Sequence, residues 1–239
     1  MLRPTALVTG GASGIGRAIC LAFEARNWNV VSADILPCPL GRGFAMTSEA
    51  PASTGSAICH VECDAASAAD IERAVATTVA AHGGITTLVN NVAIQTHNGV
   101  PCHLLDDDVW QRHQDINITS YCMHDRERRG ARAGGSGGRG GDLSCTCGHN
   151  TVLLRTGHPT SRVCSHVRSL PFTVRFSKHS IPHMLAAGGG SIVNIASVQG
   201  LASQAGIPAY AATKGACLSF TRQLANEYDC GVCVCAVIM

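Results

Sequence analysis

Some segments of this chain have the hydrophobic pattern of β-strands, and others have the 3.6-residue hydrophobic period of α-helices. Segments of the two kinds alternate along the sequence. Short apolar runs typical of buried strands occur six times, and amphipathic stretches of helical spacing separate most of them. The clearest helix is 68–82, because Ile71, Val75 and Val79 recur every four residues and Asp70 stands near its start. The predicted strands are 5–9, 29–33, 58–61, 87–90, 191–196 and 231–238. The predicted helices are 17–26, 68–82, 106–122, 176–187 and 209–228.

Strands that alternate with helices are typical of a parallel sheet covered by helices on both faces. We therefore predict an α/β fold, a doubly wound parallel sheet, formed by one domain over residues 1–239. Residues 36–57 are rich in Pro, Gly, Ser, Thr and Ala, and we expect a loop with a poor helix there. The segment 123–174 breaks the pattern, because neither the two-residue period of a strand nor the 3.6-residue period of a helix is sustained across it.

The net charge changes the interpretation of this segment. The whole chain carries a formal charge of +2. Segment 123–174 contains eight Arg and three acidic residues, a net charge of +5, so the rest of the chain is mildly acidic at −3. The slight overall basicity therefore indicates nothing about the partners of the rest of the chain.

Neither end carries a recognisable membrane or secretion signal. The apolar stretches there are shorter than the roughly 20 residues that a membrane span needs, and the first residues lack a signal-peptide pattern. The 13 cysteines follow no regular framework, which favours reduced thiols. We expect a cytoplasmic protein without a membrane partner.

A glycine-rich turn lies between the first predicted strand and the first helix, in Thr9-Gly-Gly-Ala-Ser-Gly-Ile-Gly16. Glycines allow a tight turn and the close approach of a diphosphate at a helix N-terminus. Asp34 ends the second strand 18 residues after Gly16, where a carboxylate can accept hydrogen bonds from both hydroxyls of a ribose. It would also repel a 2′-phosphate, so the pattern favours NAD over NADP. The alternative for Asp34 is an ordinary cap at a strand end.

Tyr210 and Lys214 stand four residues apart in a predicted helix and therefore share one face. A cation beside a phenol stabilises the phenolate, and such a phenol can exchange the proton of an alcohol–ketone pair during hydride transfer. This pair alone is common by chance. Ser197, which ends a predicted strand 13 residues before Tyr210, adds a hydroxyl that can hold the substrate oxygen.

Taken together, these motifs resemble the short-chain dehydrogenase/reductase family. The turn has that family's Thr-Gly-x-x-x-Gly-x-Gly spacing, and Asn90-Asn-Val-Ala93 is similar to its Asn-Asn-Ala-Gly element. The resemblance covers 1–122 and 175–239. It implies a Rossmann-type fold and an NAD-dependent oxidoreductase that interconverts a small-molecule secondary alcohol and a ketone.

The resemblance also implies a role for each matching residue. Tyr210 would act as the general acid/base, and Lys214 would assist it while holding the nicotinamide ribose. Ser197 would position the substrate oxygen, and Asp64 would contact the adenine. Asn117 would support a proton relay, although it can also be a simple polar helix residue. The implied catalytic residues are Asn117, Ser197, Tyr210 and Lys214. The implied cofactor-binding residues are Gly10, Ser13, Gly14, Ile15, Gly16, Asp34, Asp64, Ala65, Asn90, Val92, Tyr210 and Lys214.

The chain departs from the family within 123–174. Asn117 and Ser197 lie 80 residues apart, and the surplus over the family's spacing is about the length of this segment. Because joining Cys122 to Arg175 restores a family-like helix, we expect a disordered insertion without function and hypothesise that it is translated non-coding sequence. The alternatives are an Arg-rich arm that binds nucleic acid and a metal site whose spacings do not fit the usual pattern; we expect neither. The candidate metal ligands would be Cys145, Cys147, His149, His158, Cys164 and His166.

The C-terminal residues depart from the family as well. After its sixth strand the family continues with Asn-Ala-Val-x-Pro-Gly, a substrate loop, a helix and a seventh strand, whereas this chain has Cys235-Ala-Val-Ile-Met239. We expect this C-terminal truncation to compromise a family-like homodimer or homotetramer. The alternative to an active dehydrogenase is therefore a catalytically inactive nucleotide-binding or interaction protein.

Overall fold

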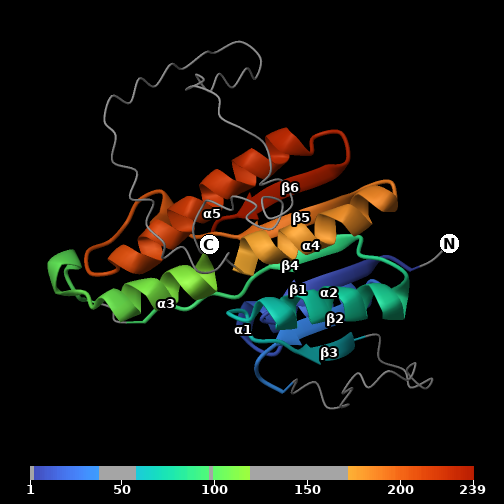
Figure 1. Ribbon diagram of the computed structural model, residues 1–239, viewed down its shortest axis with the longest axis horizontal. Coiled ribbons are helices and arrows are strands. Elements are labelled where there is room, and N and C mark those ends of the chain that lie inside the picture. The colour runs from blue at the N-terminus through green and yellow to red at the C-terminus, as the bar shows by residue number, and fades with distance from the viewer. Residues whose placement is uncertain (1–2, 38–57, 97–98, 119–171) are drawn as a thin grey trace, which may run out of the picture. The chain divides into compact units, whose positions relative to one another are not determined.

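A computed structural model describes residues 3–37, 58–96, 99–118 and 172–239. These residues form a six-stranded sheet in the order β3-β2-β1-β4-β5-β6, in which every neighbouring pair is parallel (Figure 1). The predicted parallel α/β fold is thereby confirmed. The strands are β1 (Thr5–Thr9), β2 (Asn29–Asp34), β3 (Ile58–Glu62), β4 (Thr87–Asn90), β5 (Gly190–Ile195) and β6 (Val232–Val237). The helices are α1 (Gly14–Glu24), α2 (Ala68–His82), α3 (Asp107–Asn117), α4 (Phe172–Ala186) and α5 (Pro208–Glu227), with short 3₁₀ turns η1 (Cys102–Leu104) and η3 (Val198–Gly200).

A row of aliphatic side chains crosses the sheet and accounts for its register. The row runs from β2 to β5 through Val31, Leu7, Leu88 and Ile192. All four side chains are fully buried, and each such burial stabilises the fold by about 1.5–3 kcal/mol. Every residue of β1 and β4 is buried, as expected of central strands covered on both faces.

Helices pack on both faces of the sheet. α2, α4 and α5 cover one face, where Phe176 and Met184 of α4 join the buried cluster built on Leu7 (Figure 1). α1 covers part of the other face, where Cys20 and Phe23 pack against β1 and β2. This two-sided cover leaves the carboxyl ends of the strands as the edge where loops gather, which is where open α/β sheets bind ligands.

The predicted helix 68–82 has the bounds of α2, because both of its ends are capped. The hydroxyl of Ser67 accepts a hydrogen bond from the N–H of Asp70, which satisfies one of the free donors of the first turn. Gly83 has a positive φ of 78° and donates its N–H to Val79, the usual way for a glycine to end a helix.

Three other helix boundaries differ from the prediction by three or more residues. α1 begins at Gly14, inside the glycine-rich turn, rather than at residue 17. α3 ends at Asn117 rather than at residue 122, because Ile118 is extended, with φ −161°. α4 begins at Phe172, so the last residues assigned to the insertion 123–174 are helical. The rest of that segment, with its candidate metal ligands, and the predicted loop from residue 38 to 57 lie outside the described residues.

Two further findings concern the described ranges as a whole. No helix in them has the length and apolar character that a membrane span requires. None of the eight cysteines in these ranges forms a disulfide bond: Cys20, Cys59, Cys63, Cys102, Cys217, Cys230, Cys233 and Cys235.

Candidate active site

The glycine-rich turn between β1 and α1 is shaped by glycines with different tasks. Gly10 has a positive φ of 67°. A Cβ at Gly16 would overlap the Gly10 carbonyl oxygen and lie 2.6 Å from Asn91 Nδ2. Gly14 has a φ of 51°, yet nothing lies within 4 Å of its Cβ position. The N-terminus of α1 has no side-chain cap, and Ser13 beside it is exposed, so the turn presents free space and backbone donors to an anion.

Asp34 is fixed at the end of β2 by two backbone donors. Its Oδ2 accepts a hydrogen bond from the N–H of Ala12 at 2.9 Å, and its Oδ1 accepts one from the N–H of Leu36 at 3.0 Å. Because a carboxylate oxygen can accept two hydrogen bonds, Asp34 caps the glycine-rich turn and still has acceptor capacity for a ligand. The cap that the sequence offered as an alternative therefore coexists with a possible binding role.

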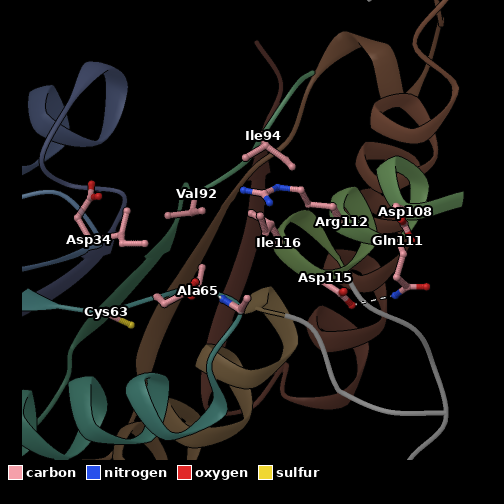
Figure 2. Close-up of a pocket in the computed structure, with 13 residues that line it drawn as sticks. Asp34, Cys63, Ala65, Val92, Ile94, Asp108, Gln111, Arg112, Asp115 and Ile116 are labelled. Atoms are coloured by element: carbon pink, nitrogen blue, oxygen red, sulfur yellow. Dashed lines mark hydrogen bonds between the residues drawn. The ribbon is translucent and has the colours of Figure 1, made fainter. Parts of the chain in front are cut away.

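A cavity of about 660 Å³ opens where the strand ends meet α3 (Figure 2). The predicted cofactor-binding residues that line it are Asp34, Asp64, Ala65 and Val92. α3 supplies another wall with Arg112 and Ile116, which were not predicted. Figure 2 shows the Arg112 side chain extending from α3 toward the segment 92–94. Burial, aided by the charge of Asp70, raises the pKa of Cys63 to about 12, so this lining thiol stays protonated at neutral pH.

The segment after β4 is held against the cavity by side chains from two other elements. Thr9 Oγ1 accepts hydrogen bonds from the N–H groups of Asn91 at 2.8 Å and Val92 at 3.3 Å. Asn117, at the end of α3, accepts from the N–H of Ile94 at 2.7 Å and donates to the Ile94 carbonyl at 2.9 Å. The side chain of the predicted catalytic Asn117 thus serves to hold this segment.

Asn90, predicted to bind the cofactor, directs its side chain into a buried polar network. Its Nδ2 donates to Asn194 Oδ1 at 2.8 Å and to Ser177 Oγ at 3.3 Å. Asn194 in turn donates to Thr221 of α5 at 2.9 Å. The network joins β4 to β5, α4 and α5, and Asn90 is not among the residues that line the cavity.

Tyr210 and Lys214 lie one turn apart near the start of α5. Lys214 Nζ is 5.6 Å from the centroid of the Tyr210 ring, and it donates to the carbonyl of Ile195 at 2.7 Å. Burial of the amine lowers the pKa of Lys214. Asn117 is tied to the same turn, because its Nδ2 donates to Thr213 Oγ1 at 3.1 Å and that hydroxyl donates to the Tyr210 carbonyl at 2.8 Å.

Ser197 follows β5 and forms the N-cap of η3. Its hydroxyl oxygen accepts from the N–H of Gln199 at 3.3 Å, and the hydroxyl donates to the carbonyl of Met239 at 3.3 Å. A Cβ at Gly200 would lie 2.7 Å from the Lys214 carbonyl. The turn that carries Ser197 therefore packs directly on α5 beside Lys214.

Three residues that hold the site were not singled out in the sequence: Thr9, Thr213 and His113, whose imidazole bonds to the backbone N–H of Thr96. Thr9 precedes the glycine-rich turn and Thr213 precedes Lys214, so both stand inside motifs that were recognised for other residues. The hydropathy pattern gives no sign that such polar side chains are buried, because it records residue type and not environment.

The fold and this edge of the sheet define a doubly wound α/β protein with a ligand cavity at the carboxyl ends of its strands. The sequence model of the family described as short chain dehydrogenase matches residues 4–131 and 169–238. The chain belongs to this family, as the motifs predicted, and the enzymes of the family use a nicotinamide cofactor. The unmatched stretch 132–168 lies within the predicted insertion and is shorter than it.

Known relatives extend the comparison over most of the chain. A 2-(S)-hydroxypropyl-CoM dehydrogenase of Xanthobacter autotrophicus is 30% identical over 223 residues, which cover 93% of this chain and 64% of the relative. A 3beta-hydroxysteroid dehydrogenase of Eggerthella lenta is 27% identical over 230 residues, covering 95% and 66%. The chain therefore spans slightly less than two thirds of the length of these relatives.

Solved structures show the same fold. A short-chain dehydrogenase/reductase from Burkholderia xenovorans, described as putative, superposes with a TM-score of 0.68 at 24% identity, covering 99% of this chain and 71% of the other. An aldohexose dehydrogenase from Thermoplasma acidophilum, solved without ligand, gives a TM-score of 0.67 at 21% identity, covering 99% and 66%.

Proposed function

We propose that this protein is an NAD-dependent oxidoreductase that interconverts a secondary alcohol and a ketone, with Tyr210 as the general acid/base. The observation that carries the proposal is the pair on α5, in which Lys214 Nζ lies 5.6 Å from the centre of the Tyr210 ring. The pair places a cation and a phenol on one face of the helix, and a phenolic hydroxyl can both donate and accept a hydrogen bond. Tyr210 can therefore take the hydroxyl proton of an alcohol or return it to a ketone.

Lys214 has donors to spare for a second task. An ammonium has three N–H groups, and one of them is used by the Ile195 carbonyl. The remaining two can bind the hydroxyls of the nicotinamide ribose, and Ser197 can orient the substrate oxygen. Asn117 holds the turn that bears Tyr210 through Thr213, and its match to the family motif is the reason to assign it to the proton relay.

The glycine-rich turn and the strand end at Asp34 fit a dinucleotide. The open space over Gly14, next to the uncapped start of α1, suits a diphosphate. The spare acceptor capacity of Asp34 suits a ribose with two free hydroxyls, and its charge disfavours a 2′-phosphate, which supports NAD over NADP. When bound, the nicotinamide supplies the hydride chemistry. The chain's own residues bind it, orient the substrate and move the proton at the substrate oxygen.

The names of the relatives indicate the substrate class. Hydroxypropyl-CoM and hydroxysteroid dehydrogenases both have names that specify oxidation at a hydroxyl-bearing carbon. The 2-hydroxypropyl group and a ring hydroxyl of a steroid are both secondary alcohols. We therefore propose a secondary alcohol as substrate for this chain.

The proposal is tested with the purified chain, by measuring NADH binding through fluorescence and NADH formation with a panel of secondary alcohols. Tyr210→Phe keeps the ring and removes the proton donor, so we expect unchanged NADH binding and a loss of turnover of about 10²–10⁴-fold. Tyr228→Phe is the matched control, because Tyr228 caps the other end of α5, about 27 Å away along the helix axis. It should retain full turnover.

Each outcome separates the alternatives. Binding without turnover of any alcohol by the wild-type chain favours the inactive nucleotide-binding protein. Absence of NADH binding contradicts the proposal altogether. Turnover that survives in Tyr210→Phe removes Tyr210 from the mechanism but leaves the cofactor assignment standing.

A further inference from the structure

The backbone from Asn91 to Thr96 has no regular secondary structure, yet two of its residues, Val92 and Ile94, line the cavity. Such a segment keeps its position only if its polar groups are bonded to something rigid. Thr9 holds the beginning of the segment and Asn117 holds its middle at Ile94, as described above. The end of the segment, at Thr96, is held by a third side chain.

That side chain is His113, which lies on α3 one turn before Asn117 and is 1% exposed. Its Nε2 is 3.2 Å from the backbone nitrogen of Thr96, and its Nδ1 is 2.8 Å from the carbonyl oxygen of Val109. A carbonyl can only accept a hydrogen bond and an amide N–H can only donate one. The two partners therefore require a neutral imidazole with its proton on Nδ1, which leaves Nε2 as the acceptor.

We propose that His113 is a positioning residue of the cofactor site, which acts by fixing the segment 91–96 to α3. The identity of the ligand rests on the proposed function, whereas the attachment of the segment 91–96 to α3 does not depend on it. His113 and Asn117 are spaced i, i+4 and so share one face of α3. Together they bind Thr96 and Ile94, and the same helix supplies Ile116 to the cavity wall. One rigid helix thus sets the distance between its own wall and the wall formed by Val92 and Ile94.

Two substitutions separate the bond to Thr96 from the bond to Val109. In His113→Asn, the short side-chain amide can occupy the position of Nδ1 and keep the bond to Val109, but it does not reach Thr96. In His113→Gln, the longer side chain can place its carbonyl oxygen near the position of Nε2 and accept from Thr96. Both substitutions introduce a neutral amide into the same buried place, so their comparison cancels the general cost of replacing the imidazole.

The measurements are amide hydrogen exchange of the segment 91–96 without ligand, NADH binding, and thermal unfolding. We expect exchange at Thr96 to be at least about fivefold faster in His113→Asn than in the wild type, because the Thr96 N–H loses its acceptor. The Kd for NADH should rise by about three- to tenfold in the same variant. His113→Gln should restore both values to within about twofold of the wild type. A nitrogen NMR spectrum of the wild-type imidazole should show the proton on Nδ1.

The outcomes are distinct. Unchanged exchange at Thr96 in His113→Asn, or a proton on Nε2 in the wild type, overturns the fixation, and the NMR result does so even where both variants fail to fold. Faster exchange with an unchanged Kd overturns the link to the cofactor site. A wild-type chain that does not bind NADH contradicts the proposed function, whereas the exchange data still decide whether His113 fixes the segment.

Discussion

A pair of alanine substitutions in the glycine-rich turn should separate folding from cofactor binding. In Gly16→Ala, the new methyl group would overlap the Gly10 carbonyl oxygen and come within 2.6 Å of Asn91 Nδ2. The backbone must shift to relieve this overlap. In Gly14→Ala, the new methyl group would meet nothing within 4 Å, but the residue would keep a φ of 51° that alanine disfavours.

The expected magnitudes follow from these contacts. Alanine within a helix is intrinsically better than glycine by about 1 kcal/mol, so any destabilisation in Gly16→Ala reports the overlap alone. Overpacking against backbone atoms should lower the free energy of unfolding by about 3 kcal/mol. For Gly14→Ala the left-handed backbone costs only about 1 kcal/mol. Its methyl group fills the free space over the turn, so we expect NADH binding to weaken by about tenfold or more.

Urea denaturation and fluorescence titration with NADH test the pair on the same preparations. The expected pattern is a large loss of stability in Gly16→Ala and a mainly binding defect in Gly14→Ala. Equal stability of Gly16→Ala and the wild type would show that Gly16, in the first turn of α1, does not lie against the Gly10 carbonyl as described. Unchanged NADH affinity in Gly14→Ala would show that the ligand does not use the free space over that residue.

Two further substitutions address the acidic residues. Asp34→Asn removes the charge that repels a 2′-phosphate and keeps one acceptor for Ala12, so the affinity for NADPH relative to NADH should rise by about tenfold. In the control, Asp64→Asn, this affinity ratio should stay constant. A constant ratio in both variants would show that Asp34 does not select between NAD and NADP. The N–H of Asp64, and then the guanidinium of Arg73, hold the pKa of Asp70 below its usual range. Its contribution to stability is thus complete above about pH 4 and is lost as the pH falls through the lowered pKa. Asp70→Asn should therefore lower the free energy of unfolding by about 1 kcal/mol at neutral pH. Below about pH 3 the variant and the wild type should have the same free energy of unfolding. A difference in urea denaturation that does not change with pH would show that the charge of Asp70 is not its cause.

Much of the fold could be predicted because its strongest signals are local. Central parallel strands are buried on both faces, so the adjacent apolar residues within 5–9 and 87–90 indicate buried strands. The helix 68–82 carries its own caps, Ser67 and Gly83. The end of α3 could not be predicted in the same way, because Ile118 would continue the helical pattern and its extended backbone is set by the structure around it.

The candidate site was predictable as a set of positions and less so as a set of contacts. Gly10, Gly16 and Asp34 could be selected because the turn and the strand end require their chemistry in almost any doubly wound fold. The direction of the Asn90 side chain depends on Asn194, which lies 104 residues later in the chain. The partner of His113 lies in a segment without periodicity. Contacts of that kind depend on the assembled fold and leave no regular pattern in the sequence.

The contacts also determine which substitutions can report on chemistry alone. Asp34, Asn117 and Lys214 each bind backbone groups of another segment, at Ala12, Ile94 and Ile195 respectively. Replacing any of them removes a buried bond and alters the shape of the site together with its chemistry. Among the described residues, the hydroxyl of Tyr210 forms no hydrogen bond that would be lost in Tyr210→Phe. A loss of turnover in Tyr210→Phe therefore measures proton transfer more directly than a loss in any other variant of the proposed catalytic tetrad. Variants of Asn117, Ser197 and Lys214 require a stability measurement before their kinetics can be interpreted.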